Sequence, residues 1–395
     1  MNKINMTKLS VSLVALIAAS STQAATWQAG DWELGLGGNI NAFFMSTQCS
    51  AGDLGAGGGT MAGLACAGSV DENGNPTDSQ SVQNGLLPAS LNFSAKTEQE
   101  GWDIGANVNV YYGVNSNDGG GADALKFSSV DARQVYLTAG RKGGGEFKLG
   151  RDFGLFGFDP IINDMSLVGA GANFVASDPG HTTLGGLGYG YVYTDRLAQM
   201  NYTTADMNGF KGTFGIFQPM DGNGATSAGE LGFHGKAAYS KGNFSTSATF
   251  LTQGVNTDAG TSEDIQGFDI FAKADFGKVG LAGSYFDAEG MTSLAIGGLV
   301  FPGFDAATGT PEETTGYMLQ GTVKASPKLK LGLNYAHSEQ DKVTRVENDK
   351  VTVGAYYGLT KSLTVMGEYS DNESKLIGTG TDQSSNVNLG AILFF

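Results

Sequence analysis

The amino-acid sequence predicts an all-β fold from three observations. First, polar and apolar residues alternate with a period of two over most of the chain, as in Asp103 to Tyr112, which reads DIGANVNVYY. Second, the connections between the alternating segments are short and long in turn. Third, no segment beyond the N-terminus approaches the roughly 18 consecutive apolar residues that a membrane-spanning helix needs. Such alternation is typical of strands with one apolar and one polar face.

Sixteen strands of this kind are predicted along the chain. They cover residues 32–46, 87–98, 102–115, 127–141, 145–154, 189–205, 210–219, 230–241, 244–255, 265–276, 279–290, 314–326, 329–340, 347–360, 362–376 and 383–395. Connections after the even-numbered strands are short, whereas those at 47–86, 155–188 and 291–313 are long. A soluble β-sandwich gives no reason for this asymmetry, but a transmembrane antiparallel β-barrel combines short periplasmic turns with long external loops. We therefore expect a sixteen-stranded barrel with both chain ends on the periplasmic side.

The composition fits a wall that faces lipid on one side and water on the other. Glycine supplies 62 of 395 residues, charged residues make up only 16%, and the formal net charge is −16. Glycine permits tight turns and strand bends, and small inward residues keep a lumen open. Aromatic residues near strand ends, such as Trp102, Tyr111 and Tyr357, predict girdles at the two membrane surfaces. The acidic balance argues against nucleic acid as a partner.

The first 24 residues have the pattern of a secretory signal peptide. Lys3 and Lys8 flank the start of a short apolar run, and Ala24 ends a small-x-small cleavage site. We expect cleavage after Ala24, which leaves 25–395 as one barrel domain and makes its net charge more negative. An uncleaved membrane anchor is the alternative.

The two cysteines, Cys49 and Cys66, lie in a glycine-rich polar stretch. Export to an oxidising compartment predicts a disulfide between them. No histidine or paired acid lies nearby at the spacing of metal ligands, so no metal site and no cofactor are expected.

The connection at 155–188 differs from a solvated external loop because it is rich in apolar residues. Four of them fall on one face of a helix: Ile161, Ile162, Met165 and Val168. Asp159 and Pro160 predict the helix start, with the carboxylate as N-cap and the proline at the first helical position. We expect this third loop to fold into the lumen as a constriction, with Asp159 and Asp164 near the opening. Packing outside, on a neighbouring subunit or other loops, is the alternative.

Four stretches of the chain carry a family resemblance. They are Arg133 to Leu137 (RQVYL), Gly145 to Arg151 (GEFKLGR), the loop segment Gly154 to Gly169, and the terminal Phe395. In these, and over essentially the whole mature chain, the sequence resembles the sixteen-stranded trimeric general porins of Gram-negative outer membranes. The resemblance implies passive diffusion of small hydrophilic solutes and ions, without catalysis. It also implies a homotrimer in contact with outer-membrane lipid and lipopolysaccharide, and Phe395 as a signal for the barrel assembly machinery.

In that family, acidic groups of the third loop face basic groups on the opposite wall, and the field between them orients polar solutes. The resemblance implies Arg151 as one of the basic groups. Alternation with Phe147 turns Lys148 inward and makes it a second candidate. In the period-two alternation, Arg151 falls on the same face as the outward residues. It therefore reaches the pore only where Gly150 or a bulge interrupts the strand.

Two further arginines are candidates for the pore or for the outer rim. Arg133 shares its parity with Val135, so it either lines the constriction or pairs with lipopolysaccharide phosphate outside. Arg196 is ambiguous in the same way. Many members of that family carry an inward arginine at the position of Asn92. Its absence here weakens the basic wall.

A general diffusion channel, with a mild cation preference that follows from the acidic charge, is the function that the sequence favours. A substrate-specific porin of the same fold is the first alternative, with Tyr111, Tyr136 and Phe156 as an aromatic track. A barrel enzyme and an adhesin built on a soluble sandwich are less favoured. The three histidines lie in unrelated segments, and neither a G-x-S-x-G nor an H-E-x-x-H motif occurs.

Overall fold

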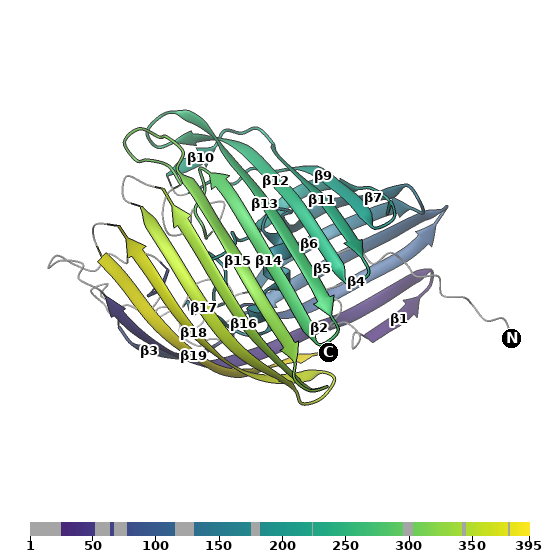
Figure 1. Ribbon diagram of the computed structural model, residues 1–395. Helices are drawn as coiled ribbons and strands as arrows, with labels where there is room; N and C mark the ends of the chain where they lie inside the picture. Colours follow the sequence, from purple (N-terminus) through teal and green to yellow (C-terminus); the bar gives the residue numbers. More distant parts are fainter. Residues whose placement is uncertain are drawn as a thin grey trace, which may run out of the picture.

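One antiparallel sheet closes on itself into a tilted barrel in the computed structural model of the chain (Figure 1). The structure describes residues 25–51, 64–66, 77–114, 130–174, 182–222, 224–294, 303–341, 345–377 and 380–395. The last wall strand pairs with the first, with Leu389 opposite Phe44, and this pairing closes the barrel. The expected signal peptide, residues 1–24, lies outside the described residues.

Sixteen strands form the wall, which confirms the predicted number. They are β2 (Trp32–Ala51), β4 (Ala89–Gln99), β5 (Trp102–Tyr112), β6 (Val130–Arg141), β7 (Gly145–Phe153), β8 (Arg196–Thr203), β9 (Phe210–Phe217), β11 (Gly232–Lys241), β12 (Phe244–Thr257), β13 (Ser262–Phe276), β14 (Val279–Glu289), β15 (Glu313–Lys324), β16 (Leu329–Gln340), β17 (Val346–Gly358), β18 (Leu363–Leu376) and β19 (Gly380–Phe394). Three short strands pair with wall strands: β1 (Ala25–Ala29), β3 (Ser79–Gln83) and β10 (Ala225–Ser227).

The period-two pattern sorts side chains onto two faces of the wall. On β15 and β16 the outer face carries Leu319 and Leu333, which are 59% and 54% exposed, while the inner face carries the fully buried Asn334. An apolar surface of this extent would promote aggregation in water, but it is favourable against lipid. The exposed apolar residues therefore identify the outer face of the wall, and the polar buried ones identify its interior.

Short turns join the strands at one end of the barrel, where both described chain ends also lie. The turns after β11 and β13 contain Gly242 and Gly277, whose φ angles of 64° and 73° fall in the left-handed region that favours glycine. Phe395 exchanges backbone hydrogen bonds of 2.9 and 3.1 Å with Gly38 on β2, and β1 pairs with β2 next to this point. Figure 1 shows β1 and the C-terminus at this end.

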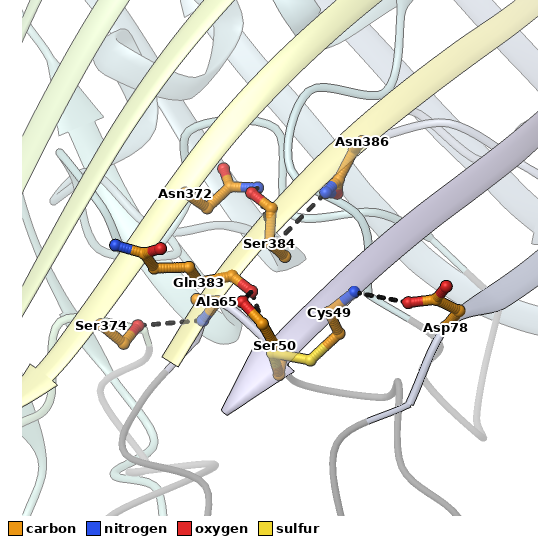
Figure 2. Close-up of a disulfide and its surroundings, with 10 residues drawn as sticks. Cys49, Ser50, Ala65, Asp78, Asn372, Ser374, Gln383, Ser384 and Asn386 are labelled. Carbon is orange, nitrogen blue, oxygen red and sulfur yellow. Dashed lines mark hydrogen bonds between the residues drawn. A yellow bond between two sulfur atoms is a disulfide. The ribbon is translucent and has the colours of Figure 1, made fainter. Parts of the chain in front are cut away.

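The disulfide predicted between Cys49 and Cys66 is present and joins the end of β2 to residues 64–66 (Figure 2). Leu64, Ala65 and Cys66 are at most 4% exposed. The Leu64 N–H donates to Asn348 Oδ1 on β17 (3.2 Å), and the Ala65 N–H donates to Ser374 Oγ on β18 (2.9 Å). The disulfide therefore fixes this short segment against the inner wall, at the end of the barrel opposite to the short turns.

Two predictions about aromatic residues were wrong. The predicted strand at 189–205 begins only at Arg196, because Tyr189 and Tyr191 belong to a folded connection in the barrel interior. Tyr111, which the sequence placed in a girdle, is 1% exposed and packs inside the barrel, as do Tyr189, Tyr191 and Tyr356. An alternation of glycine and tyrosine resembles a strand in sequence even when the aromatic rings fill a lumen.

Within the described residues, helical structure occurs in one connection. It comprises α1 (Phe158–Asn163) and the 3₁₀ turn η3 (Met165–Val168). Among the described residues, no helix is long and apolar enough to cross a membrane.

Candidate functional site: the inner segment and its charged surroundings

Residues 154–174, here called the inner segment, lie inside the barrel. Their backbone N–H groups donate to inward-facing side chains of well-separated wall strands. The pairs are Gly157 with Asp269 on β13 (2.6 Å), Met165 with Gln320 on β15 (2.6 Å), Ala170 with Glu368 on β18 (2.7 Å) and Asn173 with Asn386 on β19 (2.8 Å). A buried N–H without a partner is unfavourable, so these side chains fix the course of the segment. The alternative of packing outside the barrel does not hold for these residues.

The apolar residues of the inner segment anchor it from two sides. Ile161 and Ile162 pack in one buried cluster with Leu187 and its neighbours, while Met165 packs in another cluster that includes Tyr356. The single apolar helix face that the sequence predicted is thus divided between two clusters, because the helix ends at Asn163 and η3 turns the chain.

Asp159 is not the N-cap that the sequence predicted. The N-cap is Gly157, in a left-handed conformation (φ 72°), and no side chain caps the helix. Asp159 lies inside α1 with 6% of its surface exposed. Its carboxylate forms an ion pair with Lys236 on β11 and accepts a hydrogen bond from Ser247 Oγ on β12. The carboxylate therefore holds the helix to the wall instead of capping it.

Asp164 has a structural position at the junction of α1 and η3. Its Oδ1 accepts from the Ser166 N–H (2.8 Å), and its Oδ2 accepts from the Gly186 N–H (2.9 Å) and the Tyr191 hydroxyl (2.5 Å). Asp164 is 4% exposed. Burial, reinforced by the Asp164 charge, raises the pKa of the Tyr191 hydroxyl well above its ordinary value, so Tyr191 remains a donor. Asp164 thus joins the inner segment to the connection that precedes β8.

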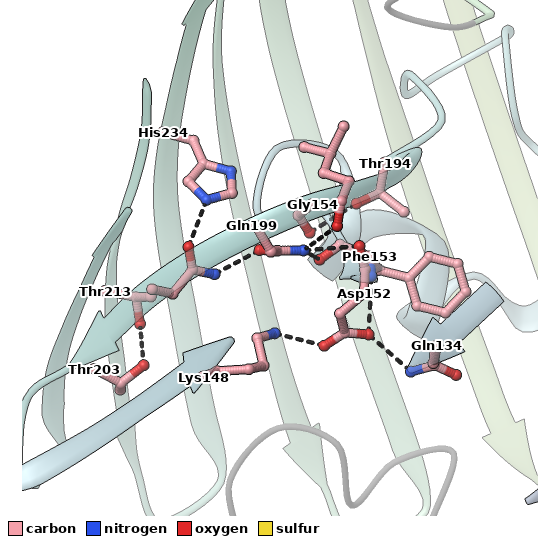
Figure 3. Close-up of polar contacts among 12 residues, drawn as sticks. Gln134, Lys148, Asp152, Phe153, Gly154, Thr194, Gln199, Thr203, Thr213 and His234 are labelled. Atoms are coloured by element: carbon pink, nitrogen blue, oxygen red, sulfur yellow. Dashed lines mark hydrogen bonds and ion pairs between the residues drawn. The ribbon is translucent and has the colours of Figure 1, made fainter. Parts of the chain in front are cut away.

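Lys148 projects inward from β7 and belongs to a network across neighbouring strands (Figure 3). Its ammonium forms an ion pair with Asp152 Oδ2 (2.5 Å), and Gln134 on β6 donates to Asp152 Oδ1 (2.8 Å). The Lys148 side chain remains 20% exposed, whereas that of Asp152 is only 5% exposed. The positive partner of this pair is therefore the one in contact with solvent.

A β-bulge resolves the ambiguity of Arg133. The register between β5 and β6 shifts at this residue, since Asn109 pairs with Gln134 but the next residue of β5 pairs with Ala132. The extra residue reverses the parity and brings the Arg133 guanidinium over the Tyr111 ring, 4.8 Å from its centroid, inside the barrel. Parity alone had placed this side chain with the outward residues.

Arg196 begins β8 and lies beside Arg133. Its Nη1 donates to Asp131 Oδ2 (2.6 Å), the same oxygen that accepts from Arg133 Nε (2.8 Å). The Arg196 side chain is 25% exposed. One carboxylate thus holds two guanidinium groups together on the inner wall.

Arg151 lies apart from these groups. The pairing of β7 is continuous through Gly150, with Arg151 opposite Val135 and Ala198. Arg151 is exposed on the outer face, which it shares with Phe147. The interruption that would turn Arg151 into the pore is not formed, so the structure does not bring Arg151 to the inner segment.

A cavity of about 170 Å³ lies between the inner segment and the wall that carries the arginines. The described residues that line it are Leu86, Leu87, Pro88, Tyr111, Arg133, Phe153, Phe158, Ile161, Ile162, Leu167, Phe174, Thr182, Thr183, Leu184, Leu187, Tyr193, Thr194, Arg196 and Leu294. Most of these side chains are apolar, and the two arginines are the only charged ones among them. Of the proposed aromatic track, Tyr111 lines this cavity, whereas Tyr136 and Phe156 do not.

Several functional residues were missed at the sequence level. Lys236 and Lys273 project from the inner face towards α1, where Lys273 Nζ donates to Asn163 Oδ1 (2.9 Å). Asp269 and Glu368 accept backbone N–H groups of the inner segment. Period-two alternation could have assigned all four to the inner face, since the opposite face of each strand carries exposed apolar or aromatic residues, such as Phe233, Phe268 and Tyr369.

Metal ligands are not grouped in the described part of the chain. There, no group of three or more His, Cys, Asp or Glu side chains is placed to hold a metal ion. His234 contacts Asn201 inside the barrel, whereas His337 contacts Asp349 on the outer face. His181 lies outside the described residues.

A closed antiparallel wall with an apolar outer face, a polar interior and an inner segment across the lumen defines an outer-membrane β-barrel channel for passive diffusion. The chain belongs to the Gram-negative porin family, whose sequence profile matches residues 11–376. None of the curated proteins matches the sequence.

Solved porin structures share the fold at low sequence identity. The anion-selective porin from Comamonas acidovorans is 17% identical with a TM-score of 0.64, and the match covers 92% of this chain and 100% of the porin. The outer-membrane channel DcaP of Acinetobacter baumannii is 14% identical (TM-score 0.69; 94% and 100% covered). Salmonella typhi OmpF, in a complex with daunomycin, is 14% identical (TM-score 0.59; 93% and 100% covered). At these identities the similarity shows the fold.

Proposed function

We propose that residues 155–188 form the constriction loop of this channel and that the constriction favours small anions over cations. The observation that carries the proposal is an asymmetry in exposure. The acids that hold the inner segment, namely Asp159, Asp164, Asp269 and Glu368, are 2–6% exposed and engaged in hydrogen bonds or ion pairs. Solvent at this level meets the basic groups, because the side chains of Lys148 and Arg196 are 20% and 25% exposed.

The selectivity proposed here is opposite to the one that the net charge predicts. A charge acts on a permeating ion mainly where the passage is narrow and the dielectric constant is low. Arg133 and Arg196 line the cavity beside the inner segment, and Lys148 projects inward from β7, whereas Arg151 lies on the outer face. The anion selectivity of the Comamonas porin, which shares the fold, supports the same preference for anions over cations.

Reversal potential in a planar bilayer under a KCl gradient tests the proposal. The wild-type channel should favour chloride. Lys148→Gln removes the exposed positive partner of Asp152 and should move the reversal potential towards potassium. Arg151→Gln, on the outer face of the same strand, is the matched control and should leave it unchanged. Potassium preference in the wild type would contradict the proposal.

The proposed assembly is a homotrimer in the outer membrane. A trimeric form occurs in a solved structure of OmpT from Vibrio cholerae, which shares the fold, and this supports the proposal. The exposed apolar wall suits contact with lipid and lipopolysaccharide, and Phe395 at the strand end is the proposed signal for the assembly machinery. The function includes no chemical step. Native mass spectrometry in detergent should give the mass of three chains, and a uniform monomer would contradict the trimer.

A further inference from the structure

The cavity beside the inner segment combines an apolar body with one cationic wall. Of the nineteen lining residues that the structure describes, Arg133 and Arg196 carry the only charges, and no acidic side chain is among them. The acidic neighbours Asp131 and Asp195 do not line the cavity. A ligand in this space therefore meets positive charge on one side and mostly apolar side chains elsewhere, with threonine and tyrosine hydroxyls among them.

The chemistry of the cationic wall selects for carboxylates. Arg196 has five N–H donors and no acceptor, and among the described carboxylates only Asp131 forms an ion pair with it, through Nη1. A guanidinium binds planar oxyanions through two parallel hydrogen bonds and repels ammonium groups. Arg133, beside it, adds a second positive charge and fixes the shared carboxylate of Asp131.

The opposite wall provides an apolar and aromatic surface. Phe158, Ile162 and Leu167 of the inner segment form this surface together with Leu187. The Phe158 ring centroid lies 6.0 Å from that of Phe153, which pairs with Arg196 across β7 and β8. Burial of apolar area against such a surface favours binding. A purely hydrophilic solute gains nothing from these contacts, whereas an aromatic ring does.

The size of the cavity limits the ligand further. An engineered apolar cavity of roughly 150 Å³ holds one benzene molecule. The volume here, about 170 Å³, therefore fits one ring with a small substituent.

From these observations we propose that the channel contains a binding site for a monocyclic aromatic carboxylate, with benzoate as the simplest example. The carboxylate contacts Arg196 and Arg133, and the ring lies against Phe158 and Leu167. The inference deepens the proposed function and rests on it, since the site lies at the proposed constriction. With this binding site, the channel would be selective for amphipathic anions and would not be a general diffusion pore.

Single-channel current in the presence of benzoate, acetate and benzylammonium tests the proposal. Benzoate should reduce the chloride current with saturation. Acetate has the charge without the ring, and benzylammonium has the ring with the opposite charge, so both should act weakly and without saturation at the same concentrations. These comparisons use the unaltered protein and do not depend on the folding of a variant.

Arg196→Gln provides the second arm. The variant leaves Asp131 paired with Arg133, and loss of a charge-assisted contact should raise the half-blocking benzoate concentration about tenfold or more. Arg151→Gln, on the outer face, should leave that concentration unchanged. Equal, unsaturable effects of benzoate and acetate would overturn the proposal while leaving a chloride preference intact. Saturable benzoate block without chloride preference would overturn only the proposed selectivity, and block unaffected by Arg196→Gln would overturn the assigned site.

Discussion

Replacement of Asp164 by asparagine should loosen the inner segment locally. Asp164 accepts three hydrogen bonds through its two oxygens, from Ser166, Gly186 and Tyr191. Asparagine offers one oxygen and places an NH₂ group where a donor already points, so at least one buried donor loses its acceptor. An unsatisfied buried donor costs about 1–3 kcal/mol, and a middle value of about 2 kcal/mol corresponds to roughly a thirtyfold change in a local opening equilibrium.

Hydrogen-exchange mass spectrometry on the detergent-solubilised protein measures that opening. Peptides that cover 158–170 and 182–190 should exchange about thirtyfold faster in Asp164→Asn when exchange reports the opening equilibrium. Peptides from the wall, such as those from β16 and β17, should keep their wild-type rates. Asp258→Asn, which alters an exposed acid in the turn after β12, is the matched control and should have no effect in either region.

The opposite pattern would refute this reasoning. If Asp164→Asn left exchange unchanged and moved the reversal potential towards chloride, Asp164 would act as a pore charge, as the sequence suggested. The structural role inferred from the burial of its carboxylate would then be wrong.

Three further substitutions test other contacts. Replacement of Cys49 and Cys66 by serine should release the segment 64–66 from the end of β2. The disulfide contributes about 3 kcal/mol for a separation of 17 residues in the chain-entropy model. Unchanged hydrogen exchange in residues 64–66 would contradict this prediction. Asp159→Asn leaves Lys236 buried without its partner and should lower stability by roughly 3–5 kcal/mol, which Lys236→Met in the same chain should largely restore in heat-unfolding gels. Gly150→Ala should lower the unfolding temperature, because φ is 130° and the new Cβ would stand 2.3 Å from a carbonyl oxygen of β6; an unchanged temperature would contradict the strained geometry.

The wall could be predicted from the sequence because every strand faces two contrasting environments. Strand β12, for example, was expected at 244–255 and is observed at Phe244–Thr257. A period of two can be recognised from neighbouring residues alone. The pairing of antiparallel strands joined by short turns can be predicted from little more. The predicted number of strands was therefore correct even where the bounds differed by a few residues.

The site could be predicted only in part, because its geometry depends on non-local contacts. A single inserted residue at Arg133 reverses the face of the side chain, and nothing in the local pattern reveals the bulge. Asp159 and Asp164 were correctly assigned to the third loop, but their partners come from β11, β12 and the connection before β8. Sequence reasoning thus found acids near the lumen and could not tell a pore charge from a buried anchor.

The salt dependence of selectivity can separate the net charge from the local charge. Acids on external surfaces act through water, and the screening length falls from about 10 Å at 0.1 M salt to about 3 Å at 1 M. Their influence on permeating ions should therefore vanish at high salt, whereas Lys148 and Arg196 stand at the proposed constriction and should be screened less. If the formal charge of −16 governed selectivity, the channel would favour potassium at low salt and lose the preference at high salt. The structure predicts instead that the preference for chloride persists or grows as KCl is raised, and reversal potentials at the two concentrations distinguish these outcomes.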